Sequence, residues 1–148
     1  MAKATSRASN NPYKKKGSII GLEQGKIPPQ AVELEEAVLG ALMIDKNALN
    51  EVIDILESEC FYKDAHREIY SAIKTLFTES QPIDMLTVST MLRKNGKLEL
   101  CGGDYGIANL TQKVASSAHI EYHARIIVQK HIQRSLIRVS SEIIHDAY

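Results

Sequence analysis

The chain has 148 residues, 24% of them charged, and a formal net charge of zero. Such a length suits one ordinary domain, and the balanced charge gives the whole chain no attraction to nucleic acid or to an anionic membrane. The two cysteines, Cys60 and Cys101, form no CxxC pair, which argues against a zinc finger and a disulfide scaffold. No stretch approaches the roughly 18 apolar residues of a membrane span, and no secretory segment opens the chain. We therefore expect a cytoplasmic protein of a single domain with no membrane contact.

The first 27 residues are predicted to be a disordered basic tail, because they are rich in Lys, Ser, Asn and Gly and poor in apolar residues. Within this tail Lys14, Lys15 and Lys16 are candidate contacts to nucleic acid, with a simply solvated tail as the alternative. The stretch GLEQGKI at 21–27 has neither the glycine spacing nor the hydroxyl residue of a Walker A loop. It predicts no nucleotide site.

From residue 28 onward the apolar spacing predicts helices. Pro28-Pro29 suits the start of the first of them, whose early turns carry Glu33, Glu35 and Glu36, where the helix dipole favours negative charge. Apolar residues three and four apart mark one face of this helix, namely Leu34, Ala37, Val38, Ala41 and Leu42.

Four further helices are predicted before the last segment of the chain. Asp45 is expected to cap the second, and the third is expected over Asp64 to Thr78. Asp84 is expected to cap the fourth, which Asn95-Gly96 ends, and a short fifth follows Gly102-Gly103. No stretch alternates apolar and polar residues long enough for a strand. The prediction is an all-α fold with a small globule of about five helices over about 28–100.

The last segment, from about Ser117 to Tyr148, is predicted to be one long helix with two apolar stripes. Two stripes indicate either a helix held between its own domain and another surface, or a central helix buried on both sides. The first stripe drifts slowly around the helix through Ile120, Ala124, Val128, Ile132, Leu136, Val139 and Ile143. The second lies near the opposite side and contains Ile126, Ile137 and Ile144.

The sequence HIEYH at 119–123 places two histidines four apart, as in zinc proteases. Those enzymes need the glutamate directly beside one histidine, whereas Glu121 lies in the middle and points to another side of the helix. We therefore predict no metal site and place His119 and His123 beside the second stripe. His66 is interpreted as a packed or capping residue, and no catalytic pairing stands out. The prediction is a chain with no catalytic residues and no cofactor of its own.

Several stretches, in order along residues 28 to 148, resemble the N-terminal domain of the bacterial replicative DNA helicases of the DnaB family. They are PPQAVELEEAVLGALMID (28–45), CFYKDAHREIYSAI (60–73), QPIDMLTVSTML (81–92), Gly102-Gly103 and HIEYHARIIVQKHIQRSLIRVSSEI (119–143). The resemblance implies a helical globule followed by a helical hairpin over about 103–147. It also implies that ATP hydrolysis, with magnesium, belongs to a RecA-like domain that this fragment lacks.

The resemblance further implies partners. Such domains pair through their hairpins into the collar of a hexameric ring around DNA, and they contribute to docking of a DnaG-type primase, with a helicase loader as a further candidate. We predict that the second stripe and its neighbours face another subunit or partner: His119, His123, Ile126, Lys130, Ile137 and Ile144. The alternative function is an independent nucleic-acid-binding domain that uses the basic tail.

One departure from the family's pattern concerns the predicted hairpin. Tyr105 comes early after the glycine pair, and Gly106 lies inside the short helix. Glycine there costs about 1 kcal/mol relative to alanine. We therefore expect this arm to be shorter or shifted.

Overall fold

The computed structural model describes residues 25–114 and 116–148, and within them it contains six α-helices, two short 3₁₀ helices and no strand. The helices are α2 (Val32–Ile44), α3 (Ala48–Val52), α4 (Asp64–Thr78), α5 (Met85–Lys94), α6 (Gly103–Gln112) and α7 (Ile120–Asp146). The 3₁₀ turns are η2 (Ser58–Cys60) and η3 (Glu99–Cys101). The predicted all-α fold with a long last helix is confirmed. No helix in the described part is long and apolar enough to cross a membrane.

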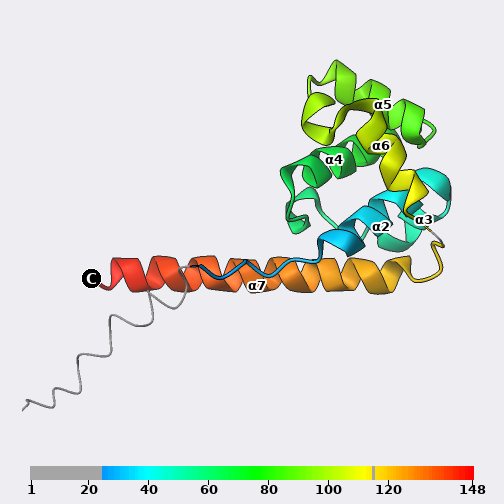
Figure 1. Cartoon of the computed structure of the whole chain (residues 1–148). Coiled ribbons are helices and arrows are strands. Elements are labelled where there is room, and N and C mark those ends of the chain that lie inside the picture. The colour runs from blue at the N-terminus through cyan, green and yellow to red at the C-terminus, as the bar shows by residue number, and fades with distance from the viewer. Residues whose placement is uncertain (1–24, 115) are drawn as a thin grey trace, which may run out of the picture.

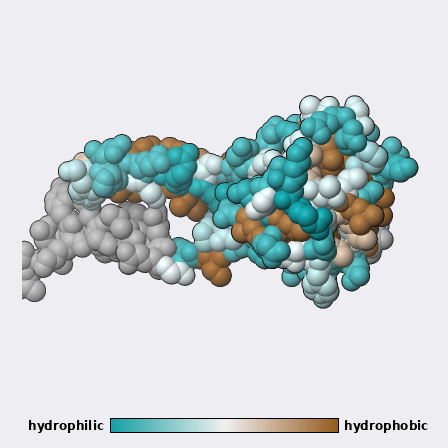
Figure 2. Space-filling model, turned by 90° about the horizontal axis from the view of Figure 1, so that it is seen from above, coloured by the Kyte–Doolittle hydropathy of each residue, from teal (hydrophilic) through white to brown (hydrophobic). Residues whose placement is uncertain are grey.

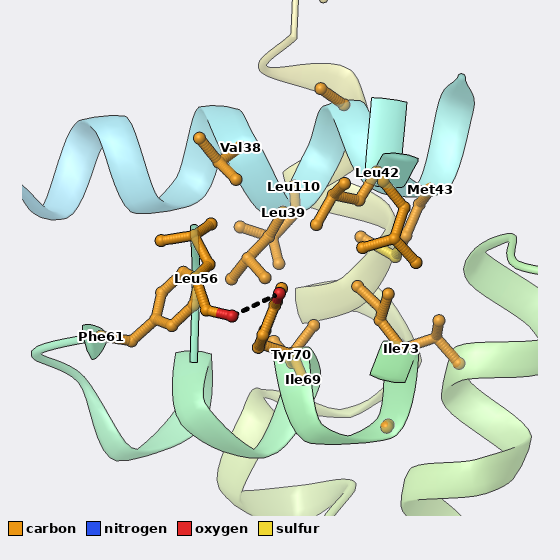
Figure 3. Packing of buried hydrophobic residues seen from close by; sticks show 14 of the residues in the cluster. Val38, Leu39, Leu42, Met43, Leu56, Phe61, Ile69, Tyr70, Ile73 and Leu110 are labelled. Atoms are coloured by element: carbon orange, nitrogen blue, oxygen red, sulfur yellow. Dashed lines mark hydrogen bonds between the residues drawn. The ribbon is translucent and has the colours of Figure 1, made fainter. Parts of the chain in front are cut away.

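The core of the globule lies between α2 and α4 (Figure 3). Leu39 and Leu42 of α2 face Ile69, Tyr70 and Ile73 of α4, and all five side chains are buried. The Tyr70 hydroxyl donates to the carbonyl oxygen of Leu56 at 3.0 Å, so the one polar atom of this ring is paired inside the core. Burial of apolar area at about 25 cal/mol per Å² is the main force that holds these helices together.

Of the two predicted helix caps, the structure confirms Asp84 and contradicts Asp45. Asp84 caps α5 in a capping box, because it accepts from the Thr87 amide at 2.9 Å while the Thr87 hydroxyl oxygen accepts from the Asp84 amide. Asp45 does not cap α3, whose N-cap is Asn47. Instead it accepts from the Asn47 amide at 2.9 Å and from the Ser117 hydroxyl at 2.7 Å. Asp45 therefore does not act as the predicted helix cap. Its side chain instead binds the loop before α7 to the end of α2.

The two arms predicted as a hairpin, α6 and α7, follow one another and share α2 as a packing partner. α6 also packs on α5, whereas α7 packs on α3 and η2 and runs beneath the globule (Figure 1). Its C-terminal half extends beyond the globule, and residues 26–29, which we call the N-terminal strap, run beside that half (Figure 1).

Gly106 does not weaken α6 as its low helix propensity suggested. A Cβ at this position would lie 2.2 Å from the carbonyl oxygen of Cys101. Glycine is therefore what allows α6 to pack against the preceding 3₁₀ turn. The helix spans Gly103–Gln112, and the expected shortening or shift of this arm stays a prediction.

Helices α4 and α5 end in the same backbone motif with different residues at its key position. Ser80 and Gly96 both adopt left-handed conformations, with φ of 55° and 69°. In each case the next residue's amide closes the motif, from Gln81 to Leu76 and from Lys97 to Leu92, both at 2.8 Å.

Ser80→Gly is expected to raise the free energy of unfolding by about 1 kcal/mol, because a side chain is strained in this conformation and glycine is not. The converse change Gly96→Ser is the matched control and should lower stability by a similar amount, since a Cβ there meets nothing within 4 Å. Urea denaturation of both variants measures the pair. Loss of stability in Ser80→Gly would contradict the assignment of strain.

Candidate subunit and partner interface

The two halves of α7 have different surroundings. In the first half Ile120, Ala124 and Ile127 are buried against the globule. From the middle of α7 onward the first predicted stripe continues onto the surface, where Ile132, Leu136, Val139 and Ile143 are 52%, 62%, 42% and 64% exposed. We call these four residues the apolar row. Their exposure excludes a helix buried on both sides.

The six predicted interface residues are spaced so that they share one side of α7, about a quarter of a turn or more from the side that meets the globule. His119 is exposed and precedes the helix, and Ile137 is 45% exposed. The other four are half-buried, namely His123, Ile126, Lys130 and Ile144. Their assignment to an interface stays a prediction.

The two histidines of HIEYH lie edge to face, with ring centroids 6.5 Å apart. Tyr122, which is 66% exposed, lies 6.1 Å from the His123 ring. Nowhere in the described residues do three His, Cys, Asp or Glu side chains come together as metal ligands would. These aromatic rings form a surface at the start of α7.

Arg134 fastens the middle of α7 to the globule and to the strap. Its guanidinium donates to the carbonyl oxygens of Pro29 at 2.7 Å and Cys60 at 2.8 Å, and it lies 5.4 Å from the centre of the Tyr62 ring. Burial lowers the pKa of Arg134; Glu35 opposes this shift and Arg67 adds to it. Arg134 therefore joins the middle of α7 to both the globule and the strap.

A buried pair of side chains near this contact, Glu35 and His66, was not predicted from the sequence. Glu35 is 1% exposed, accepts from the Tyr62 amide at 2.6 Å, and lies 2.6 Å from Nδ1 of His66. Glu35 lies in the first turn of α2 as predicted, but the sequence analysis assigned it no buried partner. The packed role predicted for His66 agrees with its 5% exposure. The missed signal was the apolar spacing of α2, on which Glu35 precedes the buried Val38, Leu39 and Leu42 by one and two turns.

The candidate nucleic-acid contacts Lys14, Lys15 and Lys16 lie outside the described residues, as do residues 21–24 of the rejected nucleotide loop. Of the tail predicted over 1–27, the structure describes only residues 25–27.

Three comparisons place the chain among known proteins. Residues 27–129 match the family described as DnaB-like helicase N terminal domain. The chain is 44% identical over 126 residues to the replicative DNA helicase DnaB of Rhodothermus marinus, covering 85% of this chain and 13% of that protein. It is 39% identical over 123 residues to the DnaB of Geobacillus stearothermophilus, covering 83% of this chain and 27% of that protein. The chain thus spans only a minor part of the length of these relatives.

A solved structure agrees with this assignment. The crystal structure of the N-terminal domain of DnaB helicase from Mycobacterium tuberculosis superposes with a TM-score of 0.80 and 31% identity, covering 82% of this chain and 87% of that one. The resemblance seen in the sequence is confirmed over the globule and the first part of α7. The chain belongs to the DnaB-like helicase N-terminal domain family.

Proposed function

We propose that this chain is the oligomerisation and partner-docking domain of a cytoplasmic hexameric replicative DNA helicase. The observation that carries the proposal is the apolar row on the overhanging half of α7. Its residues repeat at intervals of four, three and four, which is the spacing of a helix that packs along a second helix. A contiguous exposed apolar stripe of this kind marks an interaction site on a soluble domain.

A second copy of α7 is the partner that this row suits. Two such helices can pack their rows against each other in a symmetric contact, in which each residue on one copy meets its counterparts on the other. The neighbouring pair Arg138 and Glu142, whose charged atoms are 2.8 Å apart, keeps the flank of the row polar and soluble. Self-association through α7 would thus cover the apolar residues that the globule does not.

Family membership supports the rest of the proposal. We assign to this domain the collar of a ring around DNA and the docking of a DnaG-type primase, with a helicase loader as a further candidate. ATP and magnesium would be bound by a RecA-like domain of the whole protein, and the residues of this domain would supply no catalytic group. The alternative of an independent nucleic-acid-binding domain rests on Lys14, Lys15 and Lys16, and no observation in the described residues favours it.

Sedimentation velocity over a range of concentrations tests the proposal. Leu136→Asp should weaken self-association more than tenfold, because association would remove the new carboxylate from water. Ile137→Asp lies one residue further along and about 100° around the helix, so it reports on the predicted second stripe. Leu100→Asp is the control, since Leu100 is 53% exposed on η3, which packs on α4 and α6.

The two adjacent variants separate the alternatives. If only Leu136→Asp dissociates, the apolar row is the interface, and if only Ile137→Asp does, the predicted six residues are. A wild-type chain that stays monomeric at high concentration would contradict self-association, and so would equal loss in Leu100→Asp.

A further inference from the structure

A hollow of about 620 Å³ lies between the N-terminal strap and the middle of α7 (Figure 2). Its size falls in the range of about 300 to 1,000 Å³ that is typical of ligand sites. Four of its lining residues are apolar, namely Ile27, Pro28 and Pro29 of the strap and Ile137 of α7. We call it the strap cavity.

Cations surround the strap cavity. Lys26, Arg67, Arg134 and Arg138 line it, and none of its described lining residues is acidic. The cations come from three separate segments, so folding brings them together around one apolar space. Such a space repels cations and favours an anion with an apolar part.

The present partners of these cations offset their positive charge only in part. Arg134 donates to two carbonyl oxygens, which carry no formal charge. The nearby Glu35 carboxylate is already bonded to the Tyr62 amide and the His66 ring. Arg138 pairs with Glu142 where both side chains are more than half exposed, 65% and 58%. Arg67 donates through Nε to the Phe61 carbonyl oxygen at 2.8 Å, and its other nitrogens reach Asp64 only at 3.4 Å. Because an exposed pair contributes about 1 kcal/mol or less, Arg138 can turn toward a ligand at little cost.

We propose that the strap cavity binds a short acidic peptide segment of a partner protein, with an apolar side chain among its carboxylates. The apolar residue would enter between Ile137 and the two prolines, while the carboxylates meet the surrounding cations. The inference rests on the docking role proposed above and names the chemistry of the docked partner. It does not depend on self-association through the apolar row, because that row lies on another side of α7.

The walls favour a peptide over a nucleic acid strand. Single-stranded nucleic acid is held by bases that stack on open aromatic faces. Tyr62 is the one aromatic residue among the described lining residues, and the Arg134 guanidinium lies over its ring at 5.4 Å. The other apolar residues of the lining are aliphatic, which suits a leucine or phenylalanine side chain.

Fluorescence anisotropy of the full chain tests the proposal with a labelled hexapeptide of two aspartates, leucine, phenylalanine and two glutamates. We expect saturable binding that weakens with added salt. Arg138→Gln should weaken it about threefold, and the double variant Lys26→Gln/Arg138→Gln about tenfold. Peptides with amides in place of the carboxylates, or with serines in place of the apolar pair, should bind at least tenfold more weakly.

The matched control is Arg125→Gln. Arg125 is 64% exposed and pairs with Glu121 at 2.8 Å and four residues apart, just as Arg138 pairs with Glu142, but it does not line the cavity. Its peptide affinity should stay unchanged, and circular dichroism should show every variant folded. The same titration in Leu136→Asp should give wild-type affinity whether or not that variant dissociates, so failure of self-association and failure of the cavity are distinguished.

Three results would overturn the proposal. The first is the absence of saturable binding up to about 1 mM peptide, the weakest specific affinity the assay resolves. The second is equal loss in Arg125→Gln and Arg138→Gln. The third is tighter binding of a labelled oligothymidine than of the peptide, with the same dependence on Lys26 and Arg138.

Discussion

Replacing Glu35 by leucine is expected to lower the free energy of unfolding by about 3 kcal/mol. The carboxylate is buried and meets two donors, the Tyr62 amide and the His66 ring, each at 2.6 Å. Leucine leaves both without a partner in the interior, and removing one member of a buried pair costs about 3 to 5 kcal/mol. Urea denaturation at fixed protein concentration measures the loss.

Two further variants make the Glu35 result specific. Glu33→Leu changes an exposed glutamate in the same first turn of α2 and should shift stability by less than about 0.5 kcal/mol. His66→Leu should be costly alone but less costly when combined with Glu35→Leu, because the two side chains share one interaction. Additive losses would show that the pair is not a coupled unit.

The second large effect is expected at Gly40, where α2 and α6 meet. A Cβ there would lie 2.3 Å from the carbonyl oxygen of Leu110 and 2.3 Å from a methyl carbon of Val114. Alanine favours a helix by about 1 kcal/mol over glycine, yet forcing the two helices apart costs more. We expect Gly40→Ala to lower the free energy of unfolding by about 2 kcal/mol, as overpacking of a core does.

The double variant Gly40→Ala/Val114→Ala identifies the cause. It removes the contact with the valine methyl but leaves the one with the Leu110 backbone, which cannot move without shifting α6. In the Val114→Ala background, Gly40→Ala should therefore lower the free energy of unfolding by less than it does in the wild type, but still lower it. A gain in stability for Gly40→Ala, read from the same urea curves, would show that α2 and α6 are not in close backbone contact.

The stability tests at Glu35 and Gly40 and the binding tests at Leu136 and Arg138 address different parts of the molecule. Glu35 and Gly40 hold α2 to α4 and α6 within the globule, whereas Leu136 and Arg138 lie on the overhanging half of α7. Substitutions in the second group should change association while leaving the unfolding of the globule nearly unchanged.

The sequence by itself determined the features that depend on neighbours along the chain. The bounds of α4 and the Asp84 cap of α5 agree with its predictions, because apolar spacing and caps act within one or two turns. The order of motifs was enough to indicate the family, which the comparisons confirm.

Only the tertiary structure decided what depends on residues far apart in the chain. Glu35 looks like a surface glutamate until α4 brings His66 to it, and Gly106 looks like a weak helix residue until the Cys101 carbonyl approaches it. The drifting stripe of α7 is core at Ile120 and Ala124 and surface from Ile132 onward, because the stripe turns away from the globule and the helix then extends beyond it (Figure 1). Helical periodicity specifies which residues share a side, but the packing of other elements decides which sides are covered.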